Sequence, residues 1–351
     1  MKLRILLHLA LLAAIAASAH ATITVSQFTI CSDGYENSPF LFAPYGPAIS
    51  GNIVVWQKDP DIHDWDLYGY DLATHQEFPI ITDRQATAPD ISGDMVIWSD
   101  YVVGHGYNIY DYNLATHQAS PICPDAHLRF WPKIDGNIVV WQDDRNLRIS
   151  GDHIYGYDIA ADQEFAICAN GTAANPEISG NFVVWMDWRR GTLNEWGNRD
   201  IYGYDLATQQ EFCISDSGYV SDMAVSGNFA VWADGRSSGP GIYGYNLATH
   251  QEFPICINGF GSDSPDISGN IVIWRENDGD IHGLDLLTYE GFSIGTTNAV
   301  CPAIDGNNIV WRDAMNNIYG ATIVLEPATL ALLVPALLGF AGIAFRRMRR
   351  R

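Results

Sequence analysis

The sequence predicts an all-β fold, a seven-bladed β-propeller of four-stranded blades, and two observations carry this prediction. A hydrophobic run that ends in Trp and is followed by an Ile-Tyr-Gly-Tyr-Asp-Leu-like run recurs at intervals of 37 to 47 residues. The body also alternates β-branched or aromatic residues with polar ones and shows no amphipathic helical pattern. Repeats of this period built from short strands are typical of a propeller with one blade per repeat. The repeated Trp residues are Trp56, Trp98, Trp141, Trp185, Trp232, Trp274 and Trp311.

One copy, residues 265–294, illustrates the four strands that we expect in each blade. Residues 265–268 form a first strand and Gly269-Asn270 a tight turn, where positive φ is wanted. Residues 271–274 form a second strand, and a looser connection leads to a third strand at 280–286. A second short turn leads to a fourth strand at 291–294.

The seventh repeat stops after its third strand and lacks a fourth. Residues 24–31, the first strand of the body, supply a candidate, because Phe28-Thr29-Ile30-Cys31 matches Phe253-Pro254-Ile255-Cys256 of a complete repeat. We therefore expect the N-terminal strand to complete the last blade. Closing the ring in this way leaves no exposed edge between blades.

The N-terminus has the features of a secretory signal peptide over residues 1–21. Lys2 and Arg4 precede an apolar stretch, and Ala19-His20-Ala21 forms a cleavage site of small residues. The alternative is an N-terminal anchor, for which the apolar stretch is short. The propeller domain then occupies residues 22–324.

The C-terminus, residues 325–351, predicts a transmembrane helix with an Arg-rich tail. Residues 328–345 are apolar, and five Arg residues follow them, which should stay in the cytoplasm. Glu326-Pro327-Ala328-Thr329 lies at the start of this segment. These features together resemble the PEP-CTERM sorting signal, with Leu325 in place of its usual first Pro. The resemblance implies a Gram-negative bacterium, processing by an exosortase, and a place at the cell surface or in the extracellular matrix. A plain membrane anchor is the alternative.

The repeats themselves resemble those of bacterial and archaeal surface proteins. The shared pattern is Ser-Gly-Asn-Ile-Val-Val-Trp followed by Asp-Ile-Tyr-Gly-Tyr-Asp-Leu, and such repeats are similar to those of TolB-type propellers. The resemblance covers nearly the whole body. It implies the fold and a surface location, but no particular ligand.

Charge and cysteine content narrow the set of partners. Residues 22–325 contain 12 Lys and Arg against 40 Asp and Glu, a formal net charge of −28. This excess argues against nucleic acid as a partner and is compatible with a neutral polymer or divalent cations. No cofactor is expected, although Ca²⁺ stays open at Asp59, Asp61, Asp64 and Asp66 and at Asp278 and Asp280. Four of the six Cys residues, Cys31, Cys123, Cys168 and Cys256, follow the same Ile of the repeat in different blades, which favours buried thiols over disulfides.

The repeated residues are expected to be architecture, and function is expected where the copies differ. The connections between second and third strands and between successive blades vary, and in a propeller both emerge on one face. Aromatic rings mixed with Arg and carboxylates suit a sugar polymer there, whereas ordinary solvated loops are the alternative. The candidate binding residues are His127, Arg129, Trp131, Asp144, Arg145, Trp188, Arg189, Arg190, Trp196 and Arg199.

The leading hypothesis is an exported, non-enzymatic scaffold that binds an extracellular polysaccharide or another surface protein. A competing hypothesis is a polysaccharide-degrading enzyme such as a lyase, which needs a base and a cationic group. His127, Arg129, Arg189 and Arg190 could serve these roles. A third hypothesis is a structural spacer without a ligand.

Overall fold

A computed structural model describes most of the propeller region of the chain. The described residues are 23–32, 46–61, 64–82, 84–103, 106–122, 128–145, 153–169, 172–190, 198–257, 261–296 and 298–325. The predicted signal peptide, the sorting motif from Glu326 to Thr329 and the predicted transmembrane helix lie outside these residues. Within the described part of the chain, no helix has the length and apolar character needed to cross a membrane.

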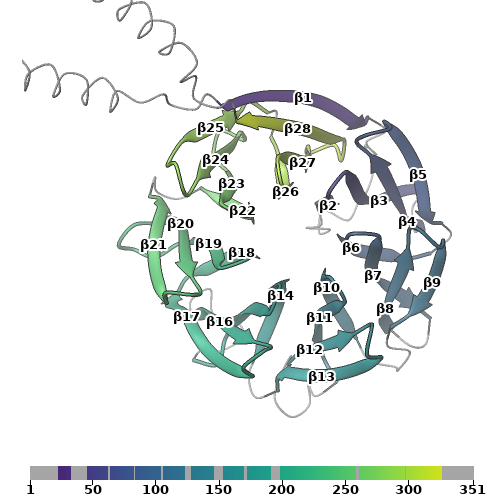
Figure 1. Cartoon of the computed structure of the whole chain (residues 1–351), viewed down its shortest axis with the longest axis horizontal. Coiled ribbons are helices and arrows are strands. Elements are labelled where there is room, and N and C mark those ends of the chain that lie inside the picture. Colours follow the sequence, from purple (N-terminus) through teal and green to yellow (C-terminus); the bar gives the residue numbers. More distant parts are fainter. Residues whose placement is uncertain are drawn as a thin grey trace, which may run out of the picture. The chain divides into compact units, whose positions relative to one another are not determined.

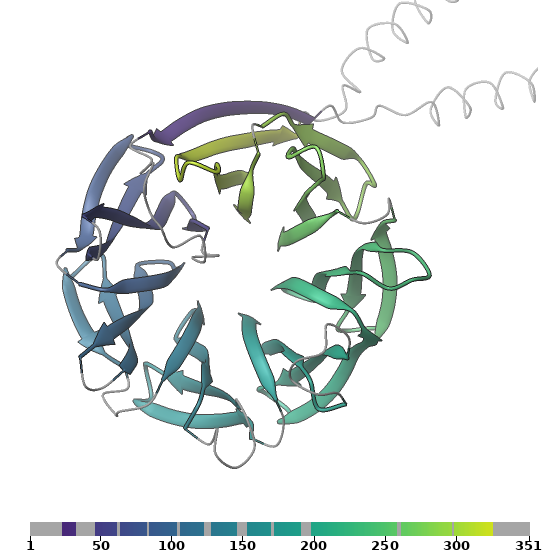
Figure 2. The same ribbon diagram turned by 180° about the vertical axis from the view of Figure 1, so that it is seen from behind.

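The predicted seven-bladed propeller is confirmed: seven four-stranded sheets follow one another around a ring (Figure 1; Figure 2 shows the opposite side). Gln27–Thr322 forms one compact unit that contains this ring. The other unit is Met1–Ser26 with Ile323–Arg351. Its described residues are Ile23–Ser26, which begin the first strand, and Ile323–Leu325, which end the last strand. Consecutive strands within a blade pair in antiparallel fashion, as an up-and-down arrangement requires.

In blades 1 to 6, the four strands run in chain order from the centre of the ring outward (Figure 1). Blade 1 consists of β2 Ala48–Ser50, β3 Ile53–Asp61, β4 Asp64–Asp71 and β5 Gln76–Ile81. Blade 2 consists of β6 Ala86–Ser92, β7 Met95–Val102, β8 Gly106–Asn113 and β9 Gln118–Pro121. Blade 3 consists of β10 Arg129–Asp135, β11 Ile138–Asp143, β12 His153–Asp158 and β13 Gln163–Cys168. Blade 4 consists of β14 Ala173–Ser179, β15 Phe182–Asp187, β16 Arg199–Asp205 and β17 Gln210–Gly218. Blade 5 consists of β18 Val220–Ser226, β19 Phe229–Asp234, β20 Gly241–Asn246 and β21 Gln251–Cys256. Blade 6 consists of β22 Asp263–Ser268, β23 Ile271–Arg275, β24 Ile281–Asp285 and β25 Gly291–Ile294. Blade 7 consists of β26 Val300–Asp305, β27 Asn308–Arg312, β28 Ile318–Leu325 and β1 Ile23–Cys31.

Blade 7 is completed by the N-terminal strand, as predicted. Strand β1 lies beside β28 at the outer edge of this blade (Figure 1). Phe28 covers Gly320 so closely that a Cβ atom at Gly320 would lie 2.4 Å from its ring. The equivalent pair in blade 5, Phe253 and Gly244, has the same arrangement. The N-terminal strand therefore packs as an ordinary fourth strand.

The repeated Trp residues form the core between blades, which confirms their structural role. Trp98, Trp141, Trp185 and Trp232 are fully buried. The largest apolar cluster runs through three blades, with Val140 of blade 3, Trp185 of blade 4 and Trp232 of blade 5. Trp98, Trp141 and Trp274 likewise belong to clusters shared with the preceding blade, so these apolar clusters tie neighbouring repeats together.

A ring of seven hydrogen bonds links successive blades at the turns between first and second strands. In each case a turn Gly donates its backbone N–H to the Ser or Asp that ends the first strand of the preceding blade. The bonds measure 2.5 to 3.0 Å. The donor and acceptor pairs are Gly93 and Ser50, Gly136 and Ser92, Gly180 and Asp135, Gly227 and Ser179, Gly269 and Ser226, Gly306 and Ser268, and Gly51 and Asp305.

The first strands are less regular than the sequence predicts, because β6, β10, β14, β18, β22 and β26 each contain a register shift. At each shift a residue adopts positive φ, and in five of the six it precedes Pro, where extended backbone is the usual expectation. A β-bulge accounts for this difference, since it inserts one unpaired residue and bends the strand. The residues with positive φ are Ala88, Trp131, Asn175, Asp222, Ser264 and Cys301.

Candidate functional site

The two faces of the propeller differ as the sequence predicts. One face, here called the uniform face, carries the short turns between first and second strands and between third and fourth strands. The other, here called the variable face, carries the remaining connections. Of the nine exposed large apolar side chains in the described chain, six lie on the variable face. These six are Tyr101, Val103, Leu128, Tyr219, Ile257 and Met315.

A cavity of about 350 Å³ lies among the first strands of all seven blades. These are the strands nearest the centre of the ring in Figure 1. Its lining includes Trp131 and five charged residues from five different blades, Asp90, Lys133, Glu177, Asp222 and Asp266. The Lys133 ammonium pairs with the Glu177 carboxylate at 2.9 Å. The sequence analysis did not identify this cluster, although a charged residue between Pro and Ile recurs in the first strands.

Burial is the main influence on the pKa values of the carboxyls that line the cavity. Burial raises the pKa of Glu177 to about 7, against the opposing charge of Lys133. Burial likewise raises the pKa of Asp266 to about 6, although Asp266 Oδ2 accepts a 2.8 Å hydrogen bond from the Ile304 N–H. The pKa of Asp90 is also raised by burial. Burial opposes the charge of Lys133, but Glu177 and Asp90 outweigh it and raise the pKa of Lys133. Carboxylates outnumber cations among these four side chains.

Four aromatic side chains form a connected series from the variable face to the cavity, here called the aromatic row. The ring centroids of Tyr101 and Tyr107 lie 5.2 Å apart, and those of Tyr107 and Phe130 lie 5.4 Å apart. Phe130 and Trp131 follow at 5.7 Å, and Trp131 lines the cavity. The first two residues flank the connection between β7 and β8, and the other two begin β10. The row therefore crosses from blade 2 to blade 3.

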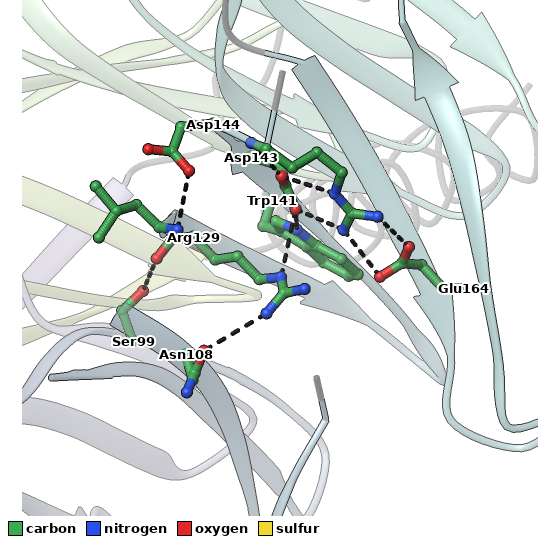
Figure 3. A network of polar contacts seen from close by, with 9 residues as sticks. Ser99, Asn108, Arg129, Trp141, Asp143, Asp144 and Glu164 are labelled. Carbon is green, nitrogen blue, oxygen red and sulfur yellow. Dashed lines mark hydrogen bonds and ion pairs between the residues drawn. The ribbon is translucent and has the colours of Figure 1, made fainter. Parts of the chain in front are cut away.

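Arg129 joins blades 2 and 3 directly before the aromatic row in the chain, and Figure 3 shows its contacts. Its fully buried side chain donates from Nε to Asp143 of blade 3 at 3.3 Å and from a terminal nitrogen to Asn108 of blade 2 at 3.5 Å. Ser99 of blade 2 donates its hydroxyl to the Arg129 carbonyl at 3.2 Å. These contacts hold the backbone immediately before Phe130 and Trp131. Arg129 thus positions Phe130 and Trp131, the two residues of the row that follow it in the chain.

Two other candidate residues, Arg145 and Arg189, belong to a repeated structural unit. Arg145 bridges Asp143 and Glu164 and lies 3.9 Å above the Tyr155 ring. Arg189 makes the same contacts with Asp187, Glu211 and Tyr202, and so does Arg236 with its own neighbours in blade 5. In all three blades the buried Asp also accepts from the repeated Trp indole at 3.0 to 3.1 Å. The Trp-x-Asp-x-Arg spacing shared by these blades is the sequence signal that identifies the unit.

These hydrogen bonds also set the acidity of the buried aspartates. Burial would raise the pKa of Asp143, but hydrogen bonds from Arg145 and Trp141 outweigh it and lower the pKa. The pKa of Asp234 is lowered in the same way by Arg236 and Trp232, against burial. Both carboxylates are therefore charged in the folded protein at neutral pH.

The remaining candidates have individual environments. Trp188 packs against the core cluster of blades 3 to 5, and Asp144 accepts a 2.9 Å hydrogen bond from the Leu128 N–H. Arg190 forms two bonds of 2.5 and 2.6 Å with Asp200, and Arg199 begins β16. His127 and Trp196 lie outside the described residues. The structure thus brings Arg129, Trp131, Asp144 and Arg145 together at the start of blade 3, while Trp188, Arg189 and Arg190 belong to blade 4.

Metal and cysteine sites add little to this picture. Among the described residues, no group of three or more His, Cys, Asp or Glu side chains is arranged to hold a metal ion. The Asp59, Asp61 and Asp64 side chains lie outside the described part, so calcium binding there stays a prediction. Asp278 Oδ1 accepts from the Asp280 N–H, and Asp280 Oδ1 from the Thr296 N–H. Of the five described cysteines, Cys31 and Cys168 are buried, Cys256 and Cys301 are partly buried, and Cys213 is exposed.

Comparison with known proteins identifies the fold. No family model and no curated protein matches the sequence. Among solved structures, the β-propeller domain of the Trilobed protease from Pyrococcus furiosus is similar with a TM-score of 0.62 and 13% identity, over 82% of this chain and 97% of that one. An oligogalacturonate lyase in complex with manganese is similar with a TM-score of 0.55 and 11% identity, over 88% and 99% of the two chains. At these identities the likeness shows the β-propeller fold alone.

Proposed function

We propose that this protein is an exported, non-enzymatic scaffold that binds an extracellular polysaccharide or another surface protein on its variable face. The observation that carries the proposal is the difference between the two faces. The uniform face consists of short repeated turns that are joined by hydrogen bonds between blades. The variable face exposes six of the nine large apolar side chains found at the described surface.

Exposed apolar side chains that lie on the same face, in connections of several blades, favour a binding role. A soluble protein gains nothing from exposing them singly, but a ligand that covers several of them removes apolar area from water. The variable connections can differ from blade to blade because the ring of strands and core Trp residues does not depend on them. A rigid ring with one individual face is suited to hold a ligand.

A binding assay with product analysis tests the proposal. The purified full-length chain would be applied to an array of extracellular polysaccharides, and the eluted sugars would be analysed. We expect retention of the protein without shortened or unsaturated products. Release of such products would show an enzyme instead, and no retention on the array would favour a protein ligand or a spacer.

Matched variants test which face binds. Replacing Tyr101 and Val103 by Ser should abolish retention, because both residues lie on the variable face. Replacing Leu287 and Tyr289 by Ser changes exposed apolar residues of the uniform face and should leave retention unchanged. The opposite result would contradict the choice of face.

We further propose that the C-terminal segment sorts the protein to the cell surface of a Gram-negative bacterium after processing by an exosortase. The Glu-Pro-Ala-Thr motif, the apolar stretch and the Arg-rich end support this proposal because they occur in that order. Until processing, the apolar stretch would hold the protein in the inner membrane with its Arg-rich end in the cytoplasm. Deletion of residues 325–351 should abolish surface display. Unchanged display would contradict it.

A further inference from the structure

We propose that the aromatic row, Tyr101, Tyr107, Phe130 and Trp131, is a binding site for an uncharged polysaccharide chain. The sugar rings would lie along the row and reach the cavity at Trp131. This site rests on the proposed function, since it names the ligand class and the residues within the variable face. The aromatic row is a different site from the connection after β15, to which the candidates Trp188, Arg189 and Arg190 of blade 4 belong.

The geometry of the row suits sugar rings. Consecutive ring centroids lie 5.2 to 5.7 Å apart, so the four side chains form a continuous apolar strip. Tyr101 is 40% exposed, and the other three are half-buried, so that part of each ring faces outward while the rest is packed. Aromatic rings pack against the C–H faces of sugars, and the two Tyr hydroxyls add polar partners for sugar hydroxyls.

The row is not part of the repeated architecture. The position of Trp131 is occupied by Gly46, Ala88, Asn175 and Ser264 in other blades, and none of these has a ring. The positive φ of Trp131, 50°, recurs at the equivalent residue of five other blades, so the backbone belongs to the repeat and only the ring is particular to blade 3. The fold therefore does not require an aromatic residue there.

The row is held rigidly, which lowers the cost of binding. Arg129 is buried, contacts blades 2 and 3, and directly precedes Phe130. Tyr101 and Tyr107 lie opposite each other on paired strands of blade 2. A ligand would order few side chains here, so less conformational entropy is lost on association.

Charge favours a neutral polymer over an acidic one. Near the row, Lys133 pairs with Glu177, Arg84 with Asp100, and Arg129 with Asp143. Asp90 and Asp266 add further negative charge at the cavity. The body carries 40 acidic against 12 basic residues. A polyanion would meet cations that already have partners and a field that repels it, whereas an uncharged sugar chain would not.

The test uses the purified full-length chain with defined polymers as probes. Laminarin, galactomannan and cello-oligosaccharides represent neutral chains, and alginate represents a polyanion at the same low salt. We expect measurable affinity for at least one neutral probe and none for alginate. Tyr101→Ala and Trp131→Gly should each weaken that affinity by about three- to tenfold, the range of one aromatic contact.

The variants are chosen so that loss of folding cannot mimic loss of binding. Tyr101 is exposed, and Gly at position 131 reproduces the residue that blade 1 has at Gly46. Tyr219→Ala, on the same face outside the row, and Tyr289→Asn, on the uniform face, are matched controls. Neither control should change affinity.

The outcomes separate this site from the proposed function. Neutral glycan binding that survives Tyr101→Ala and Trp131→Gly but is lost in Tyr219→Ala would overturn the row and leave a variable-face scaffold in place. Preference for alginate would overturn the ligand class. Loss of binding in Tyr289→Asn alone would overturn the row and the variable face together.

Discussion

The backbone N–H of Gly51 donates a 2.6 Å hydrogen bond to the carboxylate of Asp305, which joins the first blade to the last. The two residues are 254 positions apart in the chain. The same contact joins every other pair of successive blades through a turn Gly and the last residue of a first strand. The ring is thus closed twice, at this bond and by the N-terminal strand in blade 7.

Replacement of Asp305 by Ala should destabilise the protein by about 1 to 2 kcal/mol, because a hydrogen bond to a charged acceptor is lost at the closure. Asp305→Ser should restore most of this stability, since Ser makes the same bond in five other blades. Denaturant unfolding of the two variants measures the difference. Equal stability of both variants would show that the bond does not contribute to closure.

Replacement of Phe28 by Ala should cost about 2 kcal/mol, less than for a fully buried ring because Phe28 is half-buried. The side chain covers Gly320, as Phe253 covers Gly244 in blade 5. Phe253→Ala is therefore the matched variant for a blade whose four strands are consecutive. Limited proteolysis should cleave the Phe28 variant faster near its N-terminus. Strand β1 is a terminal strand, so it can detach from β28 without the rest of the blade unfolding. Equal cleavage of both variants would argue against a weak point at β1.

The fold could be predicted because its determinants are repeated in the sequence. The seven Trp residues gave the number of blades, and the match of Phe28 to Phe253 placed the N-terminal strand correctly. Repetition shows which residues the ring needs, since each copy must pack against the next in the same way.

The candidate site was predicted only in part, for a physical reason. Arg145 and Arg189 were assigned to binding, yet both are engaged with a buried Asp and a Glu of their own blades. Trp131 was identified, but its contact with Phe130 and Tyr107 depends on how two blades meet, which spacing along the chain does not reveal. The cavity charges were missed because they come from five separate strands.

Replacement of Arg129 by Met should destabilise the protein by about 3 to 5 kcal/mol, since it leaves the buried Asp143 without one of its two Arg partners. The matched variant is Arg145→Met, which removes the other, partly exposed partner and should cost less. Thermal unfolding compares the two. A smaller loss for Arg129→Met would contradict the assignment of Arg129 as the anchor of the junction between blades 2 and 3.

The stability of the protein should fall as pH rises from about 4.5 to 7, because of the carboxyls that line the cavity. In the folded state burial raises the pKa of Glu177 to about 7 and that of Asp266 to about 6, above the ordinary values of 4.5 and 3.8. In this range the folded state binds more protons than the unfolded chain, so raising the pH favours unfolding. Lys133, whose pKa is raised, stays charged throughout.

Glu177→Gln tests this dependence, because Gln keeps the shape of the side chain and cannot ionise. The free energy of unfolding, measured at pH 5 and pH 8, should differ less in Glu177→Gln than in the unmodified protein, and least in the double variant with Asp266→Asn. Asp143 and Asp234 have lowered pKa values, so their contribution to stability is lost only below about pH 4 and does not disturb the comparison. An unchanged difference between pH 5 and pH 8 in both variants would show that the cavity carboxyls are not the source.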